Sequence, residues 1–146
     1  MNTTSRLRPK MLDRSVPRSR RGAAAVEFAV VSPFLIAVLL GVIELGRAVM
    51  VHQTLVSTAR EACRVAVLPG TTNQDVINRA TTSLNAAGIG TFTVTMNPDP
   101  PSGAAEGTAV TVTIKVSFNN VSWLPVPIYL NGKNLSASSV MRREWD

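Results

Sequence analysis

Residues 20–47 read RRGAAAVEFAVVSPFLIAVLLGVIELGR, in which a long apolar run follows two arginines and a glycine. Between Ala23 and Ile43 the run holds a single charged side chain, that of Glu27. These 21 residues would form a helix about 31 Å long, which matches a hydrocarbon core of about 30 Å. No other part of the sequence stays apolar for long enough to cross a bilayer, so the sequence predicts one membrane-crossing helix.

The net charge of the chain lies in its N-terminal arm. The sequence has 15 Lys and Arg against 9 Asp and Glu, a formal net charge of +6. Residues 1–22 account for all of this charge, because eight basic and eight acidic side chains balance from Ala23 onward. A basic arm can bind nucleic acid, but this one lacks interleaved aromatic side chains, and we expect no nucleic-acid partner. The positive-inside rule instead predicts a cytoplasmic N-terminus.

A secretory signal peptide is the alternative interpretation of the apolar run. Its apolar core usually has about 7–15 residues and ends in a small-x-small cleavage site. Here the run is longer and continues directly into a charged helical segment. We therefore expect a basic cytoplasmic leader at residues 1–22, a retained transmembrane helix at 23–44 and an extracytoplasmic domain at 45–146.

Beyond the membrane segment a helical pattern continues as far as Pro69-Gly70. Side chains recur at steps of three and four, which predicts one amphipathic stripe on a helix of residues 23–68. The expected members of the stripe are Leu45, Ala48, Val49, His52, Leu55, Val56, Ala59, Ala62, Cys63 and Ala66. We expect His52 to pack in a core or an interface rather than bind a metal. Cys63 is expected to be a small buried residue rather than a reactive or intermolecular thiol.

The rest of the chain predicts a short helix and a small sheet. Thr72 or Asn73 can cap a helix that runs to about Ala87 and is closed by Gly88. Alternating side chains predict strands at residues 91–96 and 108–118 and a weaker one at 135–141, with irregular connections at 97–107 and 119–134. We therefore expect an α+β fold in which a long N-terminal transmembrane helix continues into an amphipathic helix packed on a small antiparallel sheet.

Three motifs in the first half of the chain resemble the TadE-like family of pilus assembly proteins, pseudopilins of the tight-adherence (Flp-type) secretion system. The motifs are residues 21–35 (RGAAAVEFAVVSPFL), 41–47 (GVIELGR) and 59–64 (AREACR). The matching positions are Gly22, Glu27, Phe28, Pro33, Glu44, Gly46, Arg47 and the Ala59-Arg60-Glu61 unit. The chain departs from the family at Leu45, where an aromatic residue is frequent, and at Ala62-Cys63, where Gly-Ala is frequent.

The resemblance implies a pilin-like protein of the bacterial inner membrane. It implies that a prepilin-type aspartic peptidase cuts after Gly22 and leaves Ala23 as the new N-terminus. It also implies that the partners are other pseudopilins or pilins and the pilus assembly platform. The sequence itself permits the cleavage, because a glycine can form a flexible joint between the leader and the helix.

Glu27 allows two interpretations. In the first, it lies one turn into the helix, where the helix dipole favours a carboxylate by about 0.3–1 kcal/mol. In the second, cleavage creates an α-amine on Ala23, four residues earlier and on the same helix face. Carboxylates in a bilayer tend to be paired. By resemblance to type IV pilins, the partner would be the amine of a neighbouring subunit, and Glu27, with Phe28 and Pro33, would set axial register during assembly. We prefer this interpretation, conditional on cleavage.

Two further features of the helix carry expectations. Pro33 removes a backbone donor, which predicts a kink or a locally melted turn rather than a break. Glu44, Gly46 and Arg47 stand where the apolar run meets the outer interface. Either the two charges only mark the membrane boundary, or Arg47 contacts a carboxylate, such as Glu44 of its own or an adjacent helix, in an assembly contact.

The sequence contains no recognisable catalytic motif. It has one histidine, no Cys/His cluster, no phosphate-binding glycine loop and no nucleophile elbow. We therefore expect no enzyme activity, metal, cofactor or small-molecule substrate. Two functions stay open: a membrane-anchored pseudopilin of a tight-adherence pilus, and an uncleaved single-pass membrane-anchored module whose extracytoplasmic domain binds a partner in the cell envelope.

Overall fold

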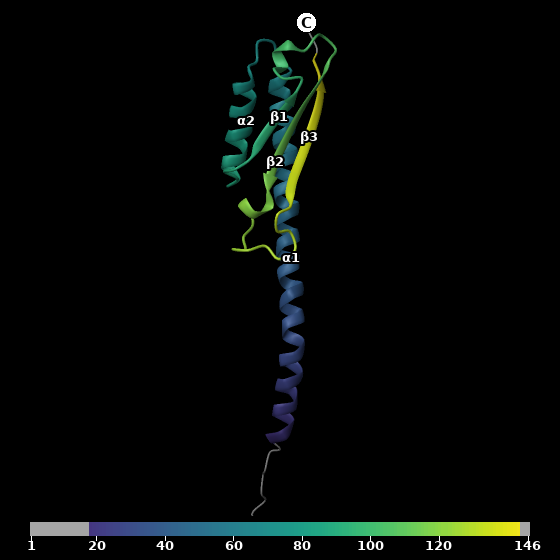
Figure 1. The fold of residues 1–146 in the computed structure, drawn as a ribbon, viewed down its shortest axis with the longest axis vertical. Helices are drawn as coiled ribbons and strands as arrows, with labels where there is room; N and C mark the ends of the chain where they lie inside the picture. Colours follow the sequence, from purple (N-terminus) through teal and green to yellow (C-terminus); the bar gives the residue numbers. More distant parts are fainter. Residues whose placement is uncertain (1–17, 144–146) are drawn as a thin grey trace, which may run out of the picture. The chain divides into compact units, whose positions relative to one another are not determined.

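The computed structural model of the chain describes residues 18–143. Within these residues two α-helices accompany three strands and two short 3-10 turns (Figure 1). In chain order the elements are α1 (Arg18–Ala66), α2 (Asn73–Ala86), β1 (Thr93–Asn97), η1 (Pro101–Gly103), β2 (Ala109–Ser117), η2 (Phe118–Asn120) and β3 (Asn134–Arg142). The predicted α+β class, with a long N-terminal helix and a small antiparallel sheet, is confirmed.

The chain divides into two compact units between Ala37 and Val38. The described part of the first unit is the beginning of α1, where every side chain from residue 22 to residue 31 is exposed. The second unit contains the rest of α1, α2 and the sheet. The hydrophobic core lies entirely within this second unit.

Helix α1 begins at Arg18, so Gly22 lies inside the helix rather than at its start. The expectation of a flexible joint at Gly22 is therefore wrong. Glycine costs about 1 kcal/mol relative to alanine in a helix, and the neighbouring arginines and alanines are strong helix formers that offset this cost. The helix also continues through Pro33 and ends at Ala66, shortly before Pro69. The missing N–H of a proline removes one hydrogen bond of the helical ladder, and the helix extends on both sides of it.

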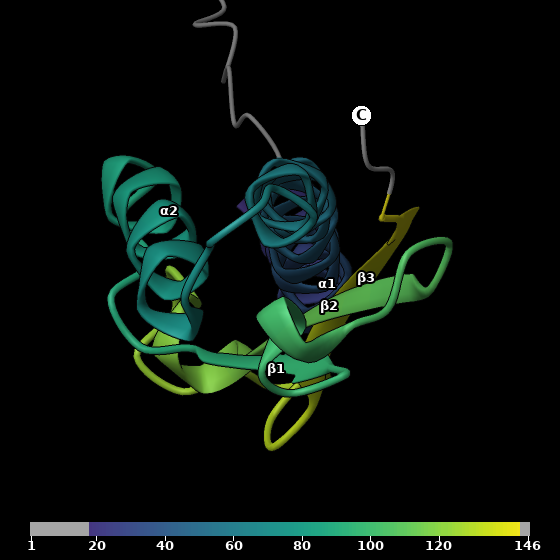
Figure 2. The same cartoon turned by 90° about the horizontal axis from the view of Figure 1, so that it is seen from above.

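The three strands form one antiparallel sheet in the order β1-β2-β3. In the second unit, α1 and α2 cover the same face of this sheet (Figure 2). Alternate side chains of the central strand β2 point into the core and are almost completely buried: Val110, Val112, Ile114 and Val116. The other face carries hydroxyl side chains, such as the row formed by Thr95, Thr113 and Ser138. The alternation predicted for β2 is thus confirmed, and it separates an apolar face from a polar one.

The buried stripe of α1 agrees with the prediction in part. Its members are Glu44, Ala48, Val51, Leu55, Thr58, Ala59, Ala62, Cys63 and Ala66. Leu45, Val49 and His52 are exposed, so the expectation that they belong to the stripe is wrong. The error has a physical cause: Leu45, Val49 and other apolar side chains also occupy the exposed side of this segment. When both faces of a helix carry apolar residues, the periodicity does not define which one is buried.

Helix α2 is capped at both ends as predicted. Thr72 is the N-cap, and its side chain and that of Asp75 form a capping box. Hydrogen bonds from the Thr72 hydroxyl and from the Thr72 N–H lower the pKa of the Asp75 carboxyl below its ordinary value. After the helix, Gly88 has a φ of +74°, and the Ile89 N–H bonds back to the Leu84 carbonyl at 2.9 Å. These caps define where α2 begins and ends.

The longest connection in the described part of the chain joins β2 to β3. We call residues 118–133 the β2–β3 loop. It is irregular, as expected, except for the turn η2 at its start. Phe118 is fully buried in the core, and the Phe118 N–H bonds to the Lys133 carbonyl at 2.8 Å, which closes the loop at its base. Val121, Trp123 and residues 128–130 of the loop contact side chains of α1.

Candidate functional site

Glu44 holds the second half of the β2–β3 loop through main-chain hydrogen bonds. Its carboxylate accepts one from the Ile128 N–H through Oε1, and through Oε2 it accepts from the Tyr129 N–H at 2.9 Å and the Leu130 N–H at 3.0 Å. The Glu44 side chain lies almost entirely inside the fold, with 1% of its surface exposed. A buried carboxylate is stable only when hydrogen-bond donors replace water, and three successive amides fill that role here.

Arg47 holds the first half of the same loop. Its Nε donates to the Val121 carbonyl at 2.7 Å, and its guanidinium lies over the Trp123 ring, 5.1 Å from the ring centroid. The planar guanidinium can bond at one edge and stack on an aromatic ring at the same time, which a lysine amine cannot do. Glu44 and Arg47, three residues apart on α1, therefore clasp the two halves of one loop. We call this pair with its loop partners the Glu44–Arg47 clamp.

The clamp differs from what the sequence suggested for these two charges. In the described part of the chain no ion pair joins Glu44 to Arg47, so the intrahelical pairing considered from the sequence is not observed. Both side chains instead reach residues 74 or more positions away in the chain. Whether they also mark a membrane boundary or take part in assembly stays a prediction.

The two glycines of the second motif, Gly41 and Gly46, have different surroundings. A Cβ added to Gly41 would stand 3.2 Å from Cε2 of Tyr129, so the absence of a side chain lets the tyrosine ring approach α1 closely. A Cβ added to Gly46 would meet no atom within 4 Å, and nothing in the described fold requires a glycine there. Gly41 thus adds a third contact between α1 and the β2–β3 loop.

The third motif also makes a tertiary contact. Glu61 forms an ion pair with Arg79 of α2 at 3.1 Å and accepts a hydrogen bond from Ser83 at 3.0 Å. Cys63 is a free, fully buried thiol, as expected, and its Sγ donates to the Val110 carbonyl at 3.3 Å. This part of α1 therefore binds α2 and the central strand.

The residues assigned to cleavage and axial register lie on the first unit's part of α1. Gly22, Ala23, Glu27 and Phe28 are all exposed, as is Pro33. Ala23 and Glu27 are one helical turn apart and share a face. Their roles in processing and in subunit pairing stay predictions.

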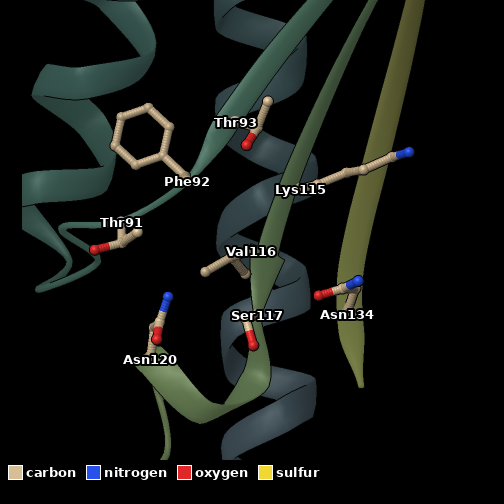
Figure 3. A pocket seen from close by; sticks show the side chains of 8 residues that line it. All are labelled: Thr91, Phe92, Thr93, Lys115, Val116, Ser117, Asn120 and Asn134. Atoms are coloured by element: carbon tan, nitrogen blue, oxygen red, sulfur yellow. The ribbon is translucent and has the colours of Figure 1, made fainter. Parts of the chain in front are cut away.

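A shallow hollow of about 280 Å³ opens where β1 begins and β2 ends (Figure 3). Its lining residues are Thr91, Phe92, Thr93, Lys115, Val116, Ser117, Asn120 and Asn134. The amine of Lys115 points away from Thr91, Phe92 and Asn120, so the polar groups do not converge on one point. Among residues 18–143 no group of three or more His, Cys, Asp or Glu side chains could hold a metal ion. In contrast to this hollow, the clamp brings two charged side chains of α1 onto four main-chain groups of one loop.

Sequence reasoning missed the part that the β2–β3 loop plays. It treated residues 119–134 as a connection, although Trp123, Pro125, Pro127 and Tyr129 are concentrated there. An aromatic and proline-rich segment without acidic residues was the available signal that the loop does more than join two strands.

The described residues thus define an α+β protein with one helix, in the segment Gly22–Ala66, that is long and apolar enough to cross a membrane. This helix suggests a single-pass membrane anchor. Residues 22–64 match the model of the family described as TadE-like protein, so the resemblance inferred from the sequence is confirmed over this segment. The match suggests a membrane protein associated with the tight-adherence pilus. No curated protein and no solved structure matches the chain.

Proposed function

We propose that this chain is a pseudopilin that takes part in assembling a tight-adherence pilus from the inner membrane. The observation that carries the proposal is the family match over residues 22–64, which contains all the motif positions from Gly22 to Arg47. The fold supports it, because a single apolar helix continues into a helix that packs on a small antiparallel sheet. The basic leader favours a cytoplasmic N-terminus and an extracytoplasmic sheet.

Processing by a prepilin-type peptidase is the first step of the proposed function. Because Gly22 lies inside α1, the peptidase must unwind the first turns of the helix before it can cut after this residue. Glycine makes that unwinding easier than alanine would, by about 1 kcal/mol. Cleavage would leave an α-amine on Ala23, on the same helix face as Glu27.

Subunit pairing is the second step. Glu27 would pair with the α-amine of a neighbouring subunit, and Phe28 and Pro33 would contribute to the register between helices. The sheet domain would then travel as one body with its helix, because the Glu44–Arg47 clamp and the Glu61–Arg79 ion pair hold it to α1. We assign the chain no catalytic role in this process.

The N-terminus of the mature protein tests the proposal. Intact-mass measurement of protein purified from the membranes of a pilus-producing host should show a chain that begins at Ala23. The variant Gly22→Leu should retain its leader, since the bulkier side chain both favours the helix and obstructs a protease cleft. The matched control Ala25→Leu lies on the same exposed stretch and should be cut normally. A wild-type chain that keeps its leader would favour the uncleaved, membrane-anchored binding module.

Glu27→Ala separates processing from assembly. We expect the variant to insert and to be cut like the wild-type protein, because the carboxylate lies beyond the cleavage site, and we expect surface pili to be lost. Immunoblot mobility and counts of surface pili measure the two effects. Normal piliation would show that Glu27 serves only the helix dipole and the interface.

A further inference from the structure

The β2–β3 loop exposes an unusual amount of apolar surface. Four of its large side chains are more than half exposed: Trp123 (61%), Val126 (68%), Ile128 (58%) and Tyr129 (54%). The sixteen residues from 118 to 133 include one lysine and no acidic residue. Several large apolar side chains exposed on one loop are a feature of interaction sites.

The loop lies beside the end of the apolar run of α1. Gly41 touches the Tyr129 ring, Glu44 binds the amides of residues 128–130, and Arg47 binds Val121. The same turns of the helix carry outward-facing apolar side chains, at Val38, Leu39, Val42 and Ile43. Gly41 precedes Glu44 by about 4.5 Å along the helix axis. The exposed apolar loop therefore continues, at the same level, the apolar surface that the helix presents.

The loop also leaves few main-chain donors without a partner. Pro125 and Pro127 have no N–H, the three amides at 128–130 are bound by Glu44, and the Leu124 N–H bonds to the Ser122 hydroxyl at 3.0 Å. Six of the seven positions from 124 to 130 thus have no N–H that needs water. Unpaired N–H groups are costly next to lipid, so bound amides favour a place for this loop at the surface of a bilayer.

The side-chain chemistry of the loop fits the surface of a bilayer. Tryptophan and tyrosine are enriched where a membrane meets water, since each ring is apolar with one polar end. Arg47 lies over the Trp123 ring, and an arginine at this depth can extend its guanidinium towards lipid phosphates. The absence of acidic side chains removes the groups that would repel anionic lipids.

We propose that the β2–β3 loop is a second membrane anchor, which places Trp123, Val126, Ile128 and Tyr129 in the interfacial layer of the bilayer that α1 crosses. The occupant of the apolar patch is lipid. The loop then fixes the tilt of the sheet domain over the membrane, and Glu44 and Arg47 link this interfacial anchor to the helix. The proposal requires that α1 spans a bilayer, and it is independent of leader cleavage and of pilus assembly.

Tryptophan fluorescence of the full chain in phosphatidylcholine vesicles tests the proposal. In the variant Trp145→Phe, Trp123 is the single tryptophan. We expect blue-shifted emission, strong quenching by a lipid spin-labelled just below the headgroup, weaker quenching by one labelled near the bilayer centre, and little quenching by acrylamide in the water. The matched control is Val140→Trp in a Trp123→Phe, Trp145→Phe background. Val140 is 61% exposed on the outer sheet face, about 20 Å along β3 from the loop. Its replacement should be quenched by acrylamide several-fold more strongly and by neither lipid.

Three results would overturn the proposal. Trp123 could be as accessible to acrylamide as the control tryptophan and insensitive to both lipids, which would show that the loop faces water. It could be shielded from acrylamide and from both lipids, which would show that protein, such as a second copy of the chain, covers the loop. Finally, Phe34→Trp in the same background could escape the deep lipid label, which would show that α1 does not span. If the leader is not cleaved or no pili form, but Trp123 is still quenched by the lipid labelled below the headgroup, only the proposed pseudopilin function is contradicted.

Discussion

Replacing Arg47 tests the clamp most directly, because two separable contacts of this side chain hold the first half of the β2–β3 loop. The bond from Nε to the Val121 carbonyl involves a charged donor and a partly buried acceptor, and such bonds contribute about 1.5–3 kcal/mol. The contact with the Trp123 ring adds about 0.5–1 kcal/mol at an exposed site. Taking the lower end of each range, Arg47→Ala should weaken the attachment of the loop by about 2 kcal/mol. Arg47→Lys keeps the positive charge but loses the planar guanidinium, and it should weaken the attachment of the loop by about half as much.

Hydrogen exchange followed by mass spectrometry gives the assay. The amides of Val121 and Ser122 bond to the Phe118 carbonyl, so they report on the first half of the loop, while residues 128–130 report on the second. A loss of 2 kcal/mol corresponds to about 30-fold faster exchange and a loss of 1 kcal/mol to about fivefold. We expect Arg47→Ala and Arg47→Lys to show these increases in a peptide covering residues 118–124, in the full chain in lipid nanodiscs.

The companion variant Glu44→Gln should instead act mainly on residues 125–133, because its NH2 group replaces one carboxylate oxygen and cannot accept the one or two N–H bonds made to that oxygen. Exchange in the central strand β2 is the internal control and should not change in any variant. Unchanged exchange of residues 118–124 in both Arg47 variants would refute the clamp. Equal acceleration in β2 would show that Arg47 stabilises the whole domain and not the loop.

Three further outcomes are expected. The capping bonds lower the pKa of the Asp75 carboxyl. The stability that this carboxylate contributes is therefore complete above its ordinary pKa near 3.8 and is lost as the pH falls through the lower pKa of the folded state. The difference in thermal midpoint between wild type and Asp75→Asn should shrink in acid. Gly41→Val should displace the packed tyrosine ring and speed exchange of residues 128–130, whereas Gly46→Ala, which meets no neighbour, should not. Leu55→Ala should lower the free energy of unfolding by about 2–5 kcal/mol in a denaturant titration, while His52→Ala, at an exposed position, should change it by less than about 0.5 kcal/mol.

The elements that local chemistry defines were predictable from the sequence. The cap at Thr72 and the stop at Gly88 depend on hydrogen bonds within a few residues, and the structure has both. The alternation of β2 identified its buried face, because valine and isoleucine alternate there with polar or charged residues. Strand ends moved by one or two residues, which is the usual uncertainty of such boundaries.

The burial of α1 was not predictable to the same degree. A helix that leaves a membrane and enters a domain carries apolar side chains for both environments, so Leu45 and Val49 resemble core residues although they are exposed. Glu44 is the reverse case. An acidic residue at the end of an apolar run is expected at the surface of the membrane, but the Glu44 side chain is buried. Only the amides supplied by a distant loop make that burial possible.

The Glu44–Arg47 clamp also connects the matched segment of α1 to a part of the chain that lies outside the match. The family match ends at residue 64, yet both clamp residues have their hydrogen-bonded loop partners between residues 121 and 130. Those bonds go to main-chain groups: three N–H groups for Glu44 and one carbonyl for Arg47. These main-chain bonds constrain the path of the loop, while the contact of Arg47 with the Trp123 ring depends on a loop side chain as well. Replacing Glu44 or Arg47 therefore removes these bonds, whereas the loop supplies them from its main chain at Val121 and at residues 128–130.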